Sequence, residues 1–222
     1  MVDISVQLGD FQLKKVSLEV PTGSYAILMG RTGCGKTTLL EILCGLTKPT
    51  SGRVELMGHD MTHAKPAERE IGYIPQDGAL FNHMTVLDQI GFPLRVRKWS
   101  RLEIAHRVGE LAEQLSIAHL LSRKPHGLSG GEIQRVAIGR ALSFKPSILC
   151  LDEPLSALDH ETRSGICDLL EGIKNQAGVT CLHITHDINE AARLADRIFT
   201  FDNGAVSTRD TTHQAQKNQS PT

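Results

Sequence analysis

The feature that most constrains this chain is the run Gly30-Arg31-Thr32-Gly33-Cys34-Gly35-Lys36-Thr37, which has the pattern G-x-x-x-x-G-K-T. The apolar run from Tyr25 to Met29 precedes it and predicts a short buried strand. The segment from Lys36 to Cys44 follows it with the apolar spacing of a helix. A strand, a glycine-rich loop and a helix in this order form the context in which the pattern binds a polyphosphate. We therefore expect an α/β protein built around a phosphate-binding loop.

The residue types in this loop explain how a phosphate would be held. Glycines let successive backbone N–H groups turn toward an anion, and the helix that begins at Lys36 adds the positive end of its dipole. Lys36 supplies a mobile cation for the β- and γ-phosphates, and Thr37 is expected to bind Mg²⁺. For Cys34 two interpretations stay open: a small residue that fits the loop, or a redox switch whose thiolate the loop favours. The nucleotide-binding residues expected here are Gly30, Arg31, Thr32, Gly33, Cys34, Gly35, Lys36, Thr37 and Thr38.

A second chemical feature is the apolar run from Ser147 to Leu151, which ends in the carboxylates Asp152 and Glu153. Asp152 is expected to hold Mg²⁺ or its waters, and Glu153 to act as the general base that polarises an attacking water. Pro154 blocks a helix directly after them, so both acids are expected at the ligand edge of the sheet. A solvated turn is the alternative interpretation of two acids at a strand end.

The order of the apolar runs predicts the organisation of the chain. Val2 to Val20 alternates apolar and polar residues around Gly9-Asp10, which predicts an antiparallel hairpin. Between Gln76 and Ser129 the pattern is almost wholly helical, with Pro93 as the only strong breaker, which predicts an inserted helical subdomain at about residues 77–130. Strands that alternate with helices elsewhere predict a parallel sheet. Further strands are expected at Arg53 to Met57, Ile71 to Pro75, Ser147 to Leu151, Val179 to Ile184 and Arg197 to Phe201, and helices near Gly131 to Ser143, Glu161 to Lys174 and Ile188 to Ala195.

These patterns also suggest domain limits. Residues 1–203 are expected to form one domain. Residues 204–222 are mostly polar and lack apolar periodicity, so we expect a tail without stable structure.

Composition narrows the class of protein. The formal net charge of −1 and the absence of a dense Lys/Arg run give no reason to expect a nucleic-acid partner. No apolar stretch approaches the ~20 residues of a membrane-spanning helix, and the N-terminus lacks the features of a secretory signal, so a cytoplasmic chain is expected. The 5 cysteines have no C-x-x-C spacing, which indicates reduced thiols. His183 and His186 invite a zinc interpretation, but no nearby carboxylate or thiol completes a ligand set.

A second glycine pair marks another anion-binding helix terminus. Ser129, Gly130 and Gly131 open a predicted helix that contains Ile133 and Val136. The chain thus carries two phosphate-holding ends. Either both serve one nucleotide within one chain, or Ser129 and Gly131 reach a nucleotide that a second copy holds.

Together with further motifs in the same order, these features resemble the nucleotide-binding subunits of ATP-binding-cassette (ABC) transporters over about Val2 to Asn203. The resemblance implies a P-loop NTPase core with a parallel sheet, an N-terminal antiparallel β subdomain and an inserted α-helical subdomain. The further motifs are Leu128-Ser129-Gly130-Gly131-Glu132, like the family's signature, Tyr73-Ile74-Pro75-Gln76, like its glutamine loop, Ser156-Ala157-Leu158-Asp159, like its D-loop, and Thr185-His186-Asp187, like its switch histidine.

The resemblance implies a role for each of these motifs. Two copies, or this chain and a similar ATPase subunit, would sandwich two ATP molecules, so that Ser129 and Gly131 of one contact the γ-phosphate bound to Lys36 of the other. Gln76 would reach Mg²⁺ and the attacking water. His186 would hold the γ-phosphate and orient Glu153, and Asp159 would cross the dimer interface.

The adenine end of the site departs from the family pattern. The family often has tyrosine before the glycine of the first turn, where this chain has Leu8 before Gly9. Phe11 is the nearest substitute for stacking on adenine, and an ordinary strand residue is its alternative role.

The resemblance implies an ATPase that couples dimer closure to the motion of separate integral membrane permease subunits at the inner face of the membrane. It is similar to bacterial importers, in which a substrate-binding protein is also a separate chain, and the segment Leu8 to Leu13 looks like that of molybdate and tungstate uptake ATPases. Ala79, Leu80, Phe81 and Met84 would offer the permease an apolar surface, with subdomain core as the alternative role.

Two other classes of protein are alternatives to a transporter ATPase. An ABC ATPase that acts on DNA or ribosomes is the main alternative, but the insertion is compact and contains no long heptad repeat. A nucleotide kinase or GTPase would leave the segment from Leu128 to Glu132 unexplained.

Overall fold

The computed structural model describes residues 1–202 and 204–209. Contacts within the chain divide it into two compact units. Residues 1–69 and the described residues from 180 onward form the first unit, and residues 70–179 form the second. The helical insertion predicted at about residues 77–130 covers only part of the second unit.

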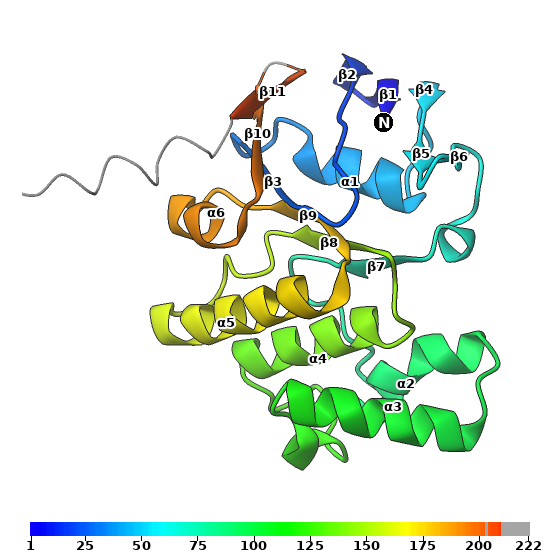
Figure 1. The fold of residues 1–222 in the computed structure, drawn as a ribbon, viewed down its shortest axis with the longest axis vertical. Helices are drawn as coiled ribbons and strands as arrows, with labels where there is room; N and C mark the ends of the chain where they lie inside the picture. Colours follow the sequence, from blue (N-terminus) through cyan, green and yellow to red (C-terminus); the bar gives the residue numbers. More distant parts are fainter. Residues whose placement is uncertain (203, 210–222) are drawn as a thin grey trace, which may run out of the picture. The chain divides into compact units, whose positions relative to one another are not determined.

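The first unit contains a sheet in the order β11-β10-β3-β9, a sheet in the order β2-β1-β4, and the pair β5-β6 (Figure 1). Its strands are β1 Val2–Leu8, β2 Phe11–Val16, β3 Tyr25–Gly30, β4 Ser51–Arg53, β5 Glu55–Leu56, β6 His59–Asp60, β9 Thr180–Ile184, β10 Arg197–Asp202 and β11 Ala205–Arg209. Its helices are α1 Lys36–Cys44, α6 Ile188–Leu194 and the 3₁₀ turn η1 Pro66–Glu68.

Strand β3 lies at the centre of the larger sheet. It pairs in parallel with β10, where Ile27 is opposite Ile198, and with β9, where Ile27 is opposite His183. Residues 25–28 are all buried, which explains why the sequence shows an unbroken apolar run instead of an alternating one. The glycine-rich loop follows this run directly, so it lies at the carboxyl end of β3.

The first hairpin is confirmed. Strands β1 and β2 pair antiparallel with Leu8 opposite Phe11, and Gly9 between them has a positive φ of 60°. Ile4 and Val6 face the core on alternate positions, as the period of the pattern predicts.

The strand expected over Arg53 to Met57 was wrong in its extent, because two short strands replace it. β4 ends at Arg53 and β5 covers Glu55–Leu56. Between them the N–H of Val54 donates to Thr62 Oγ1 at 2.9 Å, so a side chain takes the bond that a neighbouring strand would otherwise accept.

The second unit combines two parallel strands with four α-helices among its described residues. Strands β7 and β8 pair with Ile71 opposite Ile148 and Ile74 opposite Leu151. Its elements are β7 Ile71–Ile74, α2 Val86–Val96, α3 Arg101–Gln114, the 3₁₀ turn η2 Ala118–Leu120, α4 Gly130–Leu142, β8 Ile148–Asp152 and α5 His160–Ala177.

Pro93 does not end a helix, in contrast to the expectation from the sequence. It lies inside α2, which continues to Val96. Leu94, on the far side of the proline, is fully buried, so packing of the last turn outweighs the hydrogen bond that proline cannot donate.

The predicted tail needs a correction at its start. Residues 205–209 form β11, which pairs antiparallel with β10 from Asp202 opposite Ala205 to Ile198 opposite Arg209. A strand at the edge of a sheet pairs through backbone groups, so a polar sequence is no obstacle, and Asn-Gly at 203–204 is a hairpin signal. Residues 210–222 lie outside the described residues. Within the described part of the chain, no helix has both the length and the apolar character needed to cross a bilayer.

Candidate functional site

The glycine-rich loop has the predicted context. β3 ends at Gly30, and α1 begins at Lys36. Gly33 and Gly35 have φ values of 78° and 107°, in the region that favours glycine. Left-handed glycines at alternate positions can turn consecutive backbone N–H groups toward one concave side of a loop. A loop of this shape binds an anion.

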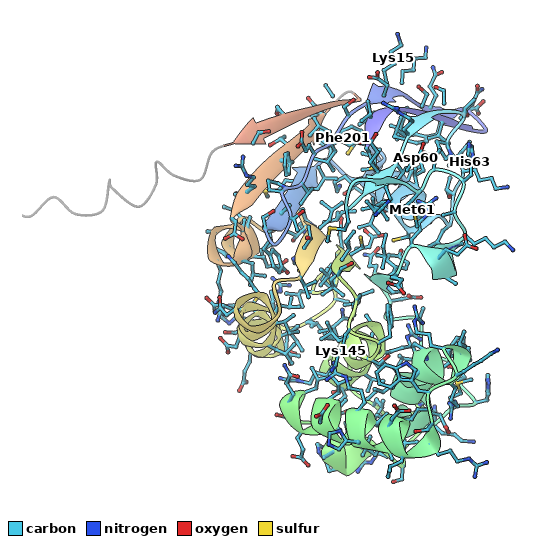
Figure 2. The ribbon with its side chains drawn as sticks, turned by 45° about the vertical axis from the view of Figure 1, so that its right-hand side comes forward. Lys15, Asp60, Met61, His63, Lys145 and Phe201 are labelled. Atoms are coloured by element: carbon cyan, nitrogen blue, oxygen red, sulfur yellow. The ribbon has the colours of Figure 1, made fainter. Side chains whose placement is uncertain are left out.

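Two features of position 30 favour glycine: its backbone conformation and its close contact with a neighbouring strand. The φ of Gly30 is 159°, and a Cβ added to it would stand 2.3 Å from the carbonyl oxygen of Phe201. Phe201, which lies on β10, is labelled in Figure 2. Cys34 lies at the same place, and its Sγ is 3.8 Å from that oxygen. The glycine-rich loop therefore packs closely against the backbone near the end of β10.

The start of α1 differs from the other helix starts. Of the α-helices in the described residues, α1 alone begins without a side-chain cap, and no acid lies in its first turn. No side-chain cap and no acidic residue therefore face the positive dipole end of α1. This arrangement fits a bound phosphate.

Lys36 is only 5% exposed, and its ammonium group lies over the loop. Nζ donates to the carbonyl oxygens of Gly30 at 2.9 Å and Arg31 at 3.0 Å. Thr37 is exposed and Thr38 half-buried in the first turn of α1. The loop therefore offers a cation, hydroxyl groups and backbone N–H groups together.

The first hairpin packs against this loop. A Cβ added to Gly35 would stand 2.6 Å from Phe11 Cζ and 3.0 Å from Leu13 Cδ2. Phe11 is half-buried, whereas Leu8 is 45% exposed. Phe11 therefore lies beside the glycine-rich loop, close to where we expect the side chain that stacks on adenine.

A cavity of about 480 Å³ opens beside the same loop in the first unit. Its walls come from β2, from the loop, and from the turn between β10 and β11. The lining residues are Gln12, Leu13, Lys14, Arg31, Thr32, Gly33, Cys34, Asp202 and Gly204.

His186 also belongs to the first unit. It is exposed and lies between the end of β9 and the start of α6. The neighbouring His183 is fully buried, and its Nδ1 is 3.0 Å from the hydroxyl oxygen of Tyr25. Burial lowers the pKa of His183 to about 3, so the imidazole is neutral near pH 7.

The two carboxylates lie at the end of β8 in the second unit. Asp152 is the last residue of the strand and is buried, and Glu153 follows it, half-buried. Glu153 has a positive φ of 43°, which costs a non-glycine residue about 1–3 kcal/mol and is typical of functional sites. A buried carboxylate offers the oxygen ligands that Mg²⁺ prefers.

Gln76 is linked to this strand end through one serine. Gln76 Nε2 donates to Ser156 Oγ at 3.3 Å, and Ser156 Oγ donates to the carbonyl oxygen of Glu153 at 2.9 Å. The structure thus brings together, within the second unit, the predicted glutamine and the predicted base. The sequence places Ser156 in the D-loop-like motif but does not predict its hydrogen bonds to Gln76 and Glu153.

The signature segment begins α4 as predicted. Ser129 Oγ accepts the N–H of Glu132 at 3.3 Å, and Glu132 Oε2 accepts the N–H of Ser129 at 2.7 Å. The hydrogen bond from Ser129 holds the pKa of Glu132 below its ordinary value. Ser129 and Gly130 are exposed, and the Ser129 hydroxyl can still donate.

Gly131 and Asp159 have structural roles that the sequence did not reveal. A Cβ added to Gly131 would stand 2.3 Å from Thr162 Cγ2, so α4 and α5 approach closely there. Asp159 caps α5 by accepting the N–H of Thr162 at 3.0 Å, a bond that lowers the pKa of Asp159. Asp159 therefore sets the start of α5, and Gly131 allows α4 to pack closely against that helix.

Arg140, on α4, holds the loop that follows Gln76. Its guanidinium donates to the carbonyl oxygens of Gly78 and Ala79, each at 2.8 Å, and lies 5.5 Å from the ring of Phe81. Phe81 is 38% exposed, so it is not simply subdomain core. This arginine contact could not be predicted from the sequence, because it joins distant segments.

Comparisons with known proteins give matches in both sequence and structure. Residues 13–156 match the ABC transporter family. A molybdate/tungstate import ATP-binding protein, WtpC, of Thermococcus kodakarensis is 46% identical over 203 residues, which are 91% of this chain and 62% of that protein. WtpC of Archaeoglobus fulgidus is 46% identical over 90% of this chain and 82% of its own length. The chain thus spans less than two thirds of the first of these relatives.

A solved structure supports the fold class. A dimeric ATP-binding cassette in a post-hydrolysis state, bound to ADP and Pi, superposes with a TM-score of 0.83 at 32% identity, over 94% of this chain and 96% of that one. The expected α/β fold with a P-loop core is confirmed, as is the resemblance noted from the motifs.

Proposed function

Because the chain belongs to the ABC transporter family as an ATP-binding cassette, we propose that it binds and hydrolyses ATP to drive solute import through a separate membrane permease. The observation that carries this proposal is the start of α1. It combines a helix start without a side-chain cap, glycines of positive φ and a buried lysine that faces the loop. The positive end of the helix dipole and the lysine cation attract the negative charge of a polyphosphate.

The chain's own residues divide the work on ATP. Lys36 and the loop N–H groups bind the phosphates, and Phe11 contacts the adenine. Thr37, Gln76 and Asp152 supply oxygen ligands to Mg²⁺, which would neutralise charge on the phosphoryl oxygens. Glu153 accepts the proton of the attacking water, and His186 contacts the γ-phosphate. The hydrogen bonds through Ser156 support the assignment of Gln76 and Glu153 to one reaction.

A second copy, or a similar ATPase subunit, would complete the site. Ser129, Gly130 and Gly131 begin a second helix, where the exposed Ser129 hydroxyl can donate to a phosphate. Asp159 would cross the interface between the two subunits. The similar cassette of known structure is dimeric, which supports this arrangement.

The permease would contact the second unit at the inner face of the membrane, which makes the chain a peripheral cytoplasmic subunit. Phe81 is exposed, and the neighbouring Ala79, Leu80 and Met84 are exposed or half-buried. An extracytoplasmic substrate-binding protein would act through the permease. We propose an oxyanion such as molybdate or tungstate as the solute, since relatives that are 46% identical carry that name.

The transport role can be tested by purifying the tagged chain from detergent-solubilised membranes of its source. We expect an untagged integral membrane protein in the complex, and ATPase activity that rises in proteoliposomes when the binding protein is loaded with molybdate or tungstate. Maltose and spermidine serve as control solutes. A chain that stays free of membrane protein, with ATPase activity stimulated by DNA or ribosomes, would contradict the proposal.

A further inference from the structure

Thr185 connects His186 to a buried carboxylate. Its hydroxyl donates to Glu190 Oε2 at 2.7 Å and accepts the N–H of Asp187 at 3.1 Å. Thr185 is 3% exposed and Glu190 is 4% exposed, so the bond between them is shielded from water. The hydroxyl of the residue before the exposed His186 thus holds the backbone N–H of the residue after it.

The orientation of these bonds makes the hydroxyl depend on the carboxylate. A hydroxyl has one proton, and here that proton is given to Glu190. A lone pair is thereby turned toward the N–H of Asp187. Without an acceptor at Glu190, the hydroxyl could rotate and its bond to Asp187 would weaken.

Asp187, which is held by the Thr185 hydroxyl, also forms hydrogen bonds to the first turn of α6. Its Oδ1 accepts the N–H of Asn189 at 2.7 Å and the N–H of Glu190 at 3.3 Å. The residue after His186 thus caps the helix that bears Glu190, and the loop closes on itself.

A neutral histidine lies behind the carboxylate. His183 Nε2 is 3.7 Å from Glu190 Oε2, and its other ring nitrogen faces the hydroxyl of Tyr25. Because burial keeps the pKa of His183 low, this imidazole adds no charge that would draw Glu190 away from Thr185. The β3 and β9 strands hold this layer in place.

We propose that Glu190 is a positioning residue for His186 and acts through the Thr185 hydroxyl. The inference rests on the proposed role of His186 at the γ-phosphate. A histidine on an exposed loop samples many positions, and tying the residue before it to the backbone N–H after it limits that freedom before the substrate arrives.

Steady-state ATPase kinetics of the full chain test this proposal with matched variants. Thr185→Val keeps the shape of the side chain but removes the hydroxyl, so we expect kcat to fall about tenfold while KM for ATP changes little. Thr185→Ser keeps the hydroxyl and should retain activity near wild type. Glu190→Gln keeps an acceptor oxygen, and should lose less activity than Thr185→Val.

A readout without nucleotide separates positioning from catalysis. Amide hydrogen exchange at Asp187 should be roughly tenfold faster in Thr185→Val than in wild type, and near wild type in Thr185→Ser. Unchanged exchange at Asp187 in Thr185→Val would overturn the proposal.

A double-mutant cycle with His186→Ala decides whether Thr185 acts through His186. We expect His186→Ala to lower kcat and Thr185→Val to have no further effect in that background. Additive losses, or wild-type kcat in Thr185→Val beside an impaired His186→Ala, would overturn the positioning role alone. Wild-type kcat in His186→Ala would overturn both this inference and the proposed role of His186.

Discussion

Gly30 lies directly against the backbone of Phe201: a Cβ added at Gly30 would stand 2.3 Å from the Phe201 carbonyl oxygen. The two residues come from opposite parts of the sequence, and their contact joins the end of β3 to the end of β10. Backbone cannot move aside as a flexible side chain can, so only glycine fits there.

We therefore expect Gly30→Ala to reduce the free energy of unfolding by roughly 3 kcal/mol or more. Gly33→Ala is the matched control, because Gly33 also has a positive φ but no atom lies within 4 Å of its added Cβ. Backbone strain alone should cost that variant about 1–2 kcal/mol. Urea denaturation measures both values. Equal losses in the two variants would show that the Phe201 contact does not matter.

Arg69 is a buried arginine at the end of α1. Its guanidinium donates to the carbonyl oxygens of Ile42 and Leu43, each at 2.7 Å, and of Thr62 at 3.1 Å. These bonds satisfy the last carbonyl groups of the helix that carries Lys36.

Arg69→Met should lower the free energy of unfolding by roughly 2–4 kcal/mol, because it removes the Arg69 donor from the buried carbonyl groups of Leu43 and Thr62. Arg53→Met is the control. Arg53 forms an exposed ion pair with Glu55 at 3.8 Å, which is worth about 0.5 kcal/mol or less. A loss for Arg69→Met no larger than that of the control would contradict the role given to Arg69.

His183 makes stability depend on pH. Burial lowers its folded pKa to about 3, whereas an unfolded histidine titrates near ~6.5. Between these values the unfolded chain binds a proton that the folded chain does not. Stability should therefore fall as pH drops from about 6.5 toward 3, by up to about 1.4 kcal/mol per pH unit, and this effect should vanish above pH ~7.

The free energy of unfolding, measured from pH 4.5 to 7.5, tests this dependence. His183→Gln should have a shallower slope than wild type by up to one proton. The same slope in His183→Gln and wild type would rule out His183 as the source.

The local parts of the site could be predicted from the sequence. The strand, loop and helix around Gly30 to Lys36 follow from apolar spacing and glycine positions within one short segment. The helix start at Ser129 follows for the same reason, since Glu132 completes its cap three residues later. Local hydrogen bonds and local patterns carry this information.

The contacts between distant segments could not be predicted in this way. Nothing near Gly30 indicates the Phe201 carbonyl, and nothing near Gln76 indicates that Arg140 holds the following loop. The split of the strand at Val54 depends on a hydroxyl from Thr62, and the helix through Pro93 depends on the packing of Leu94. Each of these features arises only after folding brings the partners together.

The central claim is that the phosphate loop of one subunit and the signature segment of another share one ATP, and Glu153→Gln tests it most directly. This variant keeps the groups that bind ATP and removes the base, so we expect no turnover and a stable dimer in Mg-ATP, seen by gel filtration with light scattering. Lys36→Ala, which loses the cation at the phosphates, should stay monomeric under the same conditions. A Glu153→Gln chain that remains monomeric at high protein and ATP concentrations would contradict the account.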